Sequence, residues 1–209
     1  MIRRFIGTYD LFNRQSGSLV ECHLYEGFAE NNTSDFLTLW KPLFDRKREE
    51  LTAAGLMTPE NLEALSLQDA AWNWPLKAGI ASLKAMATFV VEAEGVTEGL
   101  MIAAPYGFAR EPSQDGLPLT YIELLSTAPW NRAKLVPQPK YKGVGRLLMT
   151  AAVSLSLEEE QRGRIGLHAL SGASEWYRGA CGMSDLGYDE DKKMDYFEMT
   201  EAQASAFLS

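Results

Sequence analysis

A glycine-rich loop that runs directly into a helix decides the fold, and it reads Pro139-Lys140-Tyr141-Lys142-Gly143-Val144-Gly145-Arg146-Leu147-Leu148-Met149. We predict the helix over residues 144–160, because apolar side chains recur at the spacing of one helical face. These side chains form a single stripe that must pack on a core: Val144, Leu147, Leu148, Ala151, Ala152 and Leu155.

The loop also has the features of an anion site. The first N–H groups of a helix have no partner within it, and glycines let the backbone come close to a ligand. A phosphate or pyrophosphate fits such a position, and Lys140, Lys142 and Arg146 add positive charge. A plain glycine-rich helix entry explains the loop equally well. A Walker A loop is excluded because no Gly-Lys-Ser/Thr is present, and Leu148 stands where a dinucleotide fingerprint needs its third glycine.

The remaining pattern predicts an α/β protein with mixed strand pairing. The second half should run as a strand (119–127), a loop (140–145), the helix, a strand (165–170), a short helix (173–181) and a last strand (194–199). The first half offers a strand (19–26), helical segments rich in aromatic residues, a hairpin (88–93 and 100–104) and an exposed loop (110–118). Four aromatic side chains should build core or line a groove: Trp40, Phe44, Trp72 and Trp74.

Length, net charge and cysteine content exclude several classes of partner and site. The 209 residues allow one well-buried core, so we expect a single domain over 1–209. A net charge of −8 repels phosphate backbones, so no nucleic-acid partner is expected. No run of 18 apolar residues exists and residues 1–7 lack a signal-peptide core, so we expect no membrane partner and a cytoplasmic location. Cys22 and Cys181 form no Cys/His cluster, so no metal site is predicted.

Three segments, in this order, resemble those of the GNAT (Gcn5-related N-acetyltransferase) superfamily. The loop is similar to the family's Arg/Gln-x-x-Gly-x-Gly/Ala motif, with Lys140 in the Arg/Gln position. Residues 121–129 look like the central strand that splays open around the pantetheine arm of coenzyme A. Residues 170–183 resemble the family's segment Ala-x-x-Phe-Tyr-x-x-x-Gly-Phe. The spacing between Ala173, Tyr177 and Gly182 is kept, and the two Phe positions are occupied by Trp176 and Met183.

The resemblance implies a fold and an activity. The fold would be α/β (α+β), with a central mixed, mostly antiparallel sheet that splays at the acyl-CoA site and is flanked by helices. Residues 119–199 would bind CoA, and residues 1–118 would form the acceptor side. The protein, a monomer or homodimer, would move an acetyl group directly from acetyl-CoA to a primary amine of a small molecule or protein. A catalytically silent module that binds acyl-CoA for regulation is the alternative, and the acidic charge disfavours a tRNA-directed toxin.

The same resemblance implies roles for individual residues. Tyr177 would be the acid that protonates the departing sulfur, unless it is an ordinary core tyrosine. Glu123, expected on one strand face with Tyr121 and Leu125, would be the base, although a surface contact or ordered water can take its place. The residues expected to bind the cofactor are Leu125, Thr127, Lys140, Tyr141, Lys142, Gly143, Val144, Gly145 and Arg146.

Other polar residues are expected to play no part in the reaction. His168 lies out of phase with the apolar residues of its strand, which indicates a solvated or hydrogen-bonded histidine rather than a base. Residues 188–191 are expected to form a solvated acidic loop. Residues 130–139 make the gap before the glycine loop longer than the family's, so they should remodel the CoA entrance or line the acceptor site.

Overall fold

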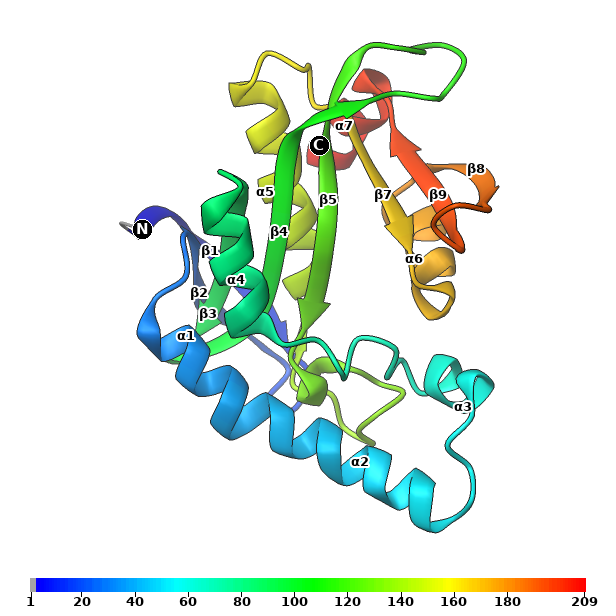
Figure 1. Ribbon diagram of the computed structural model, residues 1–209. Coiled ribbons are helices and arrows are strands. Elements are labelled where there is room, and N and C mark those ends of the chain that lie inside the picture. Colours follow the sequence, from blue (N-terminus) through cyan, green and yellow to red (C-terminus); the bar gives the residue numbers. More distant parts are fainter. Residues whose placement is uncertain (1–2) are drawn as a thin grey trace.

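The computed structural model describes residues 3–209, and Met1 and Ile2 lie outside the described residues. One sheet, with strand order β6-β1-β2-β3-β4-β5-β7-β9-β8, runs through both halves of the chain (Figure 1). In chain order the elements are β1 (Arg4–Asn13), β2 (Ser18–Glu26), α1 (Glu30–Asp35), the π-helical turn η1 (Phe36–Trp40), α2 (Lys41–Ala53), α3 (Pro59–Ala64), α4 (Trp74–Leu83), β3 (Ala87–Ala93), β4 (Val96–Phe108), β5 (Pro118–Thr127), the 3-10 turn η2 (Pro129–Asn131), β6 (Tyr141–Lys142), α5 (Val144–Glu158), β7 (Ile165–Ala169), the 3-10 turn η3 (Ser171–Ala173), α6 (Ser174–Gly179), β8 (Ser184–Asp189), β9 (Met194–Met199) and α7 (Glu201–Leu208).

Helices cover both faces of the sheet, as predicted. The stripe of α5 packs into one core with the inner faces of the strands, and the whole predicted set of apolar positions is buried there. A second core on the opposite face holds α1, η1, α2 and α4, and it buries Trp40, Phe44 and Trp74. Trp72 is only half-buried at the edge of this second core. These two layers confirm the predicted mixed, mostly antiparallel sheet flanked by helices.

The sheet splays between its two parallel neighbours, β5 and β7. They pair only from Thr120 with Ile165 to Ile122 with Leu167. Beyond that point His168 and Ala169 pair with β9 alone, and β5 continues beside β4. Figure 1 shows the two strands diverging towards η2 and α6. The opening that the resemblance implies is therefore present in the backbone.

A β-bulge lies where β5 leaves β7. Ile122 and Leu124 oppose the consecutive residues Ala103 and Ile102 of β4, so Glu123 is the extra residue. The bulge shifts the alternation of side chains by one position. Leu125 consequently packs on the α5 side of the sheet, and not on the face of Glu123 as the sequence predicted.

Several elements differ from the sequence prediction. Tyr141 and Lys142, predicted as loop, form β6 by pairing with the end of β1. Residues 188–191, also predicted as loop, begin inside β8, which pairs with β9. The partner strand of β6 is more than a hundred residues away in the sequence, so local periodicity does not predict this pairing. The strand β8 belongs to a polar hairpin at the edge of the sheet, which lacks the alternation of apolar residues that predicts a strand. The sequence prediction also lacked β1 and α7.

Candidate functional site

The glycine loop forms the N-terminus of α5 in a strained conformation. Gly143 is the residue before the helix and has φ of 112°, in the region that favours glycine. The N–H groups of Val144, Gly145 and Arg146 begin the helix, so they have no helical acceptor. A side chain on Gly145 would start 3.1 Å from the Trp176 ring, which shows how closely α6 approaches this end of α5. The backbone therefore fits an anion at this point.

The side chains of the loop contribute less positive charge than predicted. Lys140 Nζ forms an ion pair with Glu94 at 2.8 Å. Arg146 turns towards α7, where it donates to the carbonyl oxygen of Phe207 and lies over that ring. Lys142 is exposed and has no ion-pair partner among residues 3–209. A hollow of about 530 Å³ lies beside Lys142 and Gly143, and it is also lined by Asp10, Phe12, Arg14 and Leu19.

The long segment before the loop braces the loop. Asn131 accepts a hydrogen bond from the Tyr141 N–H at 2.9 Å, and the Trp130 carbonyl accepts one from the Lys140 N–H at 3.0 Å. Both residues also donate to one oxygen of Glu98, each at 2.7 Å. Glu98 on β4 is thus linked to the glycine loop through residues 130–139.

Glu98 is a buried carboxyl group that sequence reasoning missed. Its exposed fraction is 0%, and its Oε1 has no hydrogen-bond partner among the described residues. Burial raises the pKa of Glu98 to about 7, although the hydrogen bonds from Asn131 and Trp130 act in the opposite direction. The sequence pattern predicts a hairpin connection over residues 94–99, but β4 begins at Val96, so Glu98 lies inside a strand, where a buried carboxylate needs a partner. That same argument selected Glu123, which the structure places at the surface.

A buried ion pair contacts the end of β5. Arg132 binds Asp69 through both terminal nitrogens, at 2.7 and 2.6 Å. Arg132 also donates to the carbonyl of Thr127 at 2.7 Å and to the hydroxyl of Ser126 at 2.8 Å. The Thr127 carbonyl, predicted to meet pantetheine, therefore already accepts hydrogen bonds from the protein. Leu125, the other predicted backbone partner, is half-buried.

Tyr177 lies on α6 beside the opening. Only 7% of it is exposed, and its ring lies 6.0 Å from that of Phe197 and 4.9 Å from that of Trp176. Its hydroxyl makes no hydrogen bond to any residue that the structure describes. Burial, followed by the negative charge of nearby groups such as Asp69, raises the pKa of Tyr177 above its usual range. The phenol therefore keeps its proton at neutral pH, which is the state a proton donor needs.

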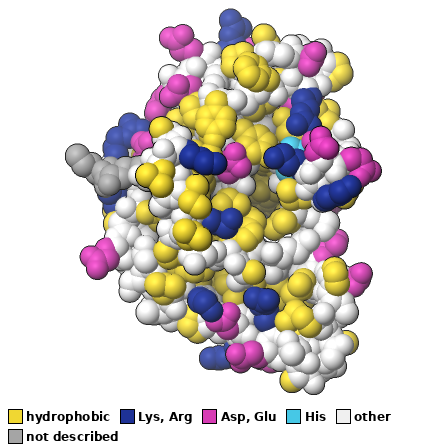
Figure 2. Space-filling model, in the orientation of Figure 1, with side chains coloured by type: hydrophobic (Ala, Val, Ile, Leu, Met, Phe, Trp, Pro, Cys, Tyr) yellow, Lys and Arg dark blue, Asp and Glu magenta, His cyan; other side chains and the backbone are white. Residues whose placement is uncertain are grey.

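Glu123 stands at the mouth of the opening on the bulge. Its side chain is exposed, and its charge contributes, after burial, to the raised pKa values of Tyr106 and Tyr121. Figure 2 shows that this face of the molecule is hollowed near its middle. Hydrophobic side chains line the hollow, and the edge of a histidine is visible beside it.

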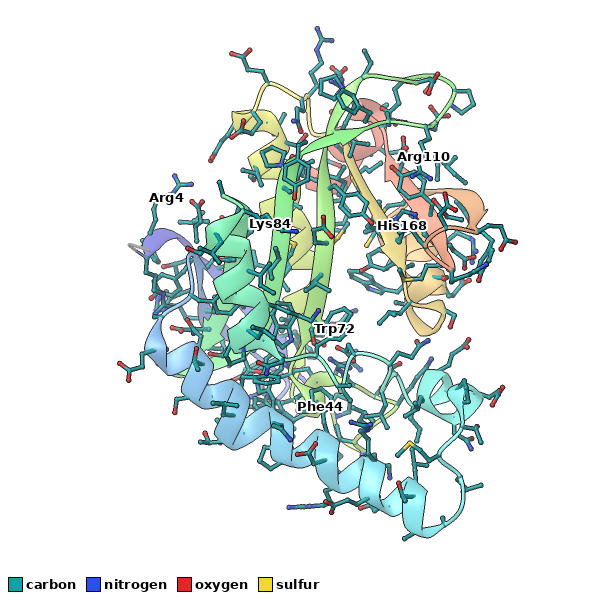
Figure 3. All side chains as sticks on the ribbon, viewed as in Figure 1. Arg4, Phe44, Trp72, Lys84, Arg110 and His168 are labelled. Carbon is teal, nitrogen blue, oxygen red and sulfur yellow. The ribbon has the colours of Figure 1, made fainter. Side chains whose placement is uncertain are left out.

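That histidine, His168, belongs to a chain of hydrogen bonds. The Tyr121 hydroxyl lies 2.5 Å from its Nδ1, and Asp189 Oδ2 lies 3.0 Å from its Nε2. Arg110 then donates to Asp189 at 2.6 Å. Figure 3 shows His168 and Arg110 close together on the β7 side of the opening. The side chain of His168 is 3% exposed, so it is the hydrogen-bonded histidine that the strand pattern indicated.

Residues 3–209 contain no group of three or more His, Cys, Asp or Glu side chains placed to hold a metal ion. None of the helices in this range combines the length and apolar character that crossing a bilayer requires.

Comparisons with known proteins identify the fold. No family model matches the sequence, and no curated protein matches it. Among solved structures, an acetyltransferase assigned to the GNAT family from Desulfovibrio desulfuricans superposes with a TM-score of 0.50 at 11% identity, over 86% of this chain and 99% of that one. A bacterial toxin also gives 0.50 at 11% identity, over 63% and 76%. The PaiA N-acetyltransferase from Thermoplasma acidophilum, solved with coenzyme A, gives 0.47 at 12% identity, over 86% and 98%. The chain has the fold of the GNAT acetyltransferases.

Proposed function

We propose that this protein is an acyl-CoA-dependent N-acetyltransferase that moves an acetyl group from acetyl-CoA to a primary amine of a small molecule or protein by direct transfer. The observation that carries the proposal is the arrangement of the opening between β5 and β7. The N-terminus of α5 lies at one end of it, and the protonated hydroxyl of Tyr177 lies beside it. A fold supports many functions, so this local chemistry is what favours acyl transfer.

The residues at the α5 end fit the pyrophosphate of CoA. The N–H groups of Val144, Gly145 and Arg146 would bind it, and Gly143 leaves room for its approach. Lys142 is the loop side chain free to neutralise a phosphate, whereas Lys140 holds Glu94 and positions the loop. Tyr141 would act through its N–H bond to Asn131. Leu125 and Thr127 would meet the pantetheine arm, with the Thr127 carbonyl shared with Arg132.

Acetyl-CoA supplies an activated thioester whose carbonyl carbon is open to an amine. Tyr177 would give its proton to the departing sulfur. Glu123 is the base that the sequence predicts, and its exposed carboxylate would also attract a cationic amine. Cytoplasmic location and a monomeric or homodimeric state remain part of this proposal.

Two measurements test the proposal. Calorimetry with acetyl-CoA should give a dissociation constant of roughly 1 μM to 1 mM, the range of enzyme substrates. Thiol release with a panel of primary amines should then detect turnover. Binding without release for any amine would favour the silent acyl-CoA-binding module, and no binding of any acyl-CoA would refute both readings.

Tyr177→Phe tests the acid. We expect kcat to fall by roughly 100-fold or more with little change in acetyl-CoA affinity, because only proton donation is lost. Tyr9→Phe, on the exposed face of β1, is the matched control and should keep the wild-type rate. Full activity of Tyr177→Phe across the pH range would remove the acid from the mechanism.

A further inference from the structure

Four side chains from separate parts of the chain form a line that leads away from the opening. Tyr121 comes from β5, His168 from β7, Asp189 from the end of β8, and Arg110 from the loop after β4. Their contacts run in sequence, with 2.5 Å between Tyr121 and His168, 3.0 Å between His168 and Asp189, and 2.6 Å between Asp189 and Arg110. The line runs from the half-buried Tyr121 through the buried imidazole of His168 to the exposed Arg110.

The charge state of Asp189 determines which atom donates and which accepts in each hydrogen bond of the line. Its carboxylate accepts from Arg110 and from the backbone N–H groups of Asp191 and Lys192, at 2.9 and 3.1 Å. The hydrogen bond from Arg110, followed by that from His168, holds the pKa of Asp189 well below its usual range, so it stays ionised. An ionised carboxylate only accepts, and His168 must therefore donate from Nε2.

The neutral imidazole then has its lone pair on Nδ1, because only one ring nitrogen carries hydrogen. Tyr121 is the group that reaches Nδ1, so its O–H donates there. The lone pairs of the Tyr121 oxygen are left to accept a proton from outside the line. Tyr121 is half-buried and stands beside the bulge that begins the opening.

The groups packed around His168 leave Tyr121 as the residue of the line that can meet a substrate. The Tyr196 ring covers His168 at 4.7 Å between centroids, and Arg110 lies over the other part of Tyr196 at 4.3 Å. Glu198 beneath them accepts the backbone N–H of Arg110 at 2.5 Å. Burial, followed by the charge of Glu198, raises the pKa of Tyr196 above its usual range, so this phenol stays neutral. The other charged group near Tyr121 is Glu123.

We propose that Tyr121 is the catalytic residue that takes the proton of the acceptor amine while it passes its own proton to Nδ1 of His168. Asp189 and Arg110 are positioning residues that fix the imidazole and stabilise its cation. This assignment rests on the proposed function and replaces Glu123 as the base. Nδ1 of His168 is hydrogen-bonded to Tyr121 and is placed to take its proton, whereas Glu123 is exposed on the bulge.

The step balances as follows. The amine nitrogen forms a bond to the carbonyl carbon and loses one proton to the Tyr121 oxygen. The Tyr121 proton moves to Nδ1 of His168. The carbon–sulfur bond breaks with its electron pair on sulfur, and sulfur takes the proton of Tyr177. Solvent then removes one proton from His168 and returns one to Tyr177.

The pH dependence of kcat/KM for the acceptor tests the relay in the full-length protein. The wild type should lose activity towards acid pH, because a proton already on Nδ1 leaves Tyr121 without an acceptor. His168→Gln keeps a polar side chain without the basicity, so the acid limb should disappear and kcat should fall by roughly 100-fold or more. Tyr121→Phe removes a single oxygen and should lower kcat similarly while the acetyl-CoA dissociation constant stays within about twofold.

Two further variants make the result decisive. His23→Gln changes the other histidine, which is half-buried on β2, and should leave the profile unchanged. Glu123→Gln should raise the KM of a cationic amine and keep the acid limb. The relay is overturned if His168→Gln and Tyr121→Phe keep the wild-type rate and profile, or if Glu123→Gln alone removes the limb. An inactive wild type across the amine panel instead refutes the transfer reaction, and the relay with it.

Discussion

Replacing Glu98 by Gln removes a carboxyl group that folding buries completely. In the folded protein the pKa of Glu98 is raised to about 7 by burial, against an ordinary value of 4.5. Between these two values the folded protein holds a proton that the unfolded chain has released. The folded state is therefore stabilised at low pH, and this stabilisation is lost as pH rises from about 4.5 through about 7.

The size of the effect follows from the shift. About 2.5 pKa units at about 1.4 kcal/mol each correspond to an upper limit of about 3.5 kcal/mol, of which about 2–3 kcal/mol falls between pH 5 and pH 8. Glutamine resembles protonated glutamate, since it accepts from Trp130 and Asn131 and does not titrate. Glu98→Gln should remove this part of the pH dependence of the free energy of unfolding, whether or not the variant is as stable as the wild type.

Urea unfolding at about pH 5 and about pH 8 measures the effect. The free energy of unfolding of the wild type should fall between these pH values by about 2–3 kcal/mol more than that of Glu98→Gln. Glu49→Gln makes the same charge change on the exposed face of α2 and should keep the wild-type dependence. Equal pH dependence in the wild type and Glu98→Gln would show that the carboxyl group is hydrated or ionised, and that reasoning from its burial is wrong.

Two other substitutions test the site's framework. Arg132→Ala leaves the carboxylate of Asp69 buried without its cation, so the free energy of unfolding should fall by about 3–5 kcal/mol; a loss below about 1 kcal/mol would mean that water reaches Asp69. Gly143→Ala places a Cβ at φ of 112°, and we expect a loss of about 1–3 kcal/mol together with weaker acetyl-CoA binding in calorimetry. Gly116→Ala, at φ of 71° in the loop after β4 with open space around it, should show strain of similar size and unchanged binding. An equal loss of acetyl-CoA affinity in both variants would show that Gly143 is not part of the binding site.

The structure explains how the site can be sensitive to pH at both ends. Glu98 is linked to the anion loop through Asn131, and His168 lies behind Tyr121 at the acceptor side. Ionisation of Glu98 introduces a buried charge next to the residues that hold the loop. We expect ionisation of Glu98 to weaken acetyl-CoA binding through the glycine loop, whereas the proposed relay at Tyr121 acts on proton transfer, and the variants above separate the two effects.

The sequence by itself determined the features that depend on neighbouring residues. The stripe of α5, the glycines before it, the strand 119–127 and the short helix that carries Tyr177 follow from periodicity and turn chemistry. Their order was enough to predict a mixed sheet, and the resemblance to the GNAT superfamily added the expectation that the sheet splays open. The aromatic segments of the first half were also correctly placed in a core.

Only the tertiary structure decided which polar groups are buried and which meet. Glu123 lies within a predicted strand, whereas Glu98 falls in residues 94–99, which the sequence pattern predicts as the connection of a hairpin. The structure extends β4 back to Val96 and so places both carboxylates in strands. The pairing of β4 with β5 expels the first on a bulge and encloses the second. Likewise, Tyr121, His168 and Asp189 become neighbours because β7 lies between β5 and β9, and β8 pairs with β9. Strand order and register arise from contacts between distant segments, and local patterns carry no information about them.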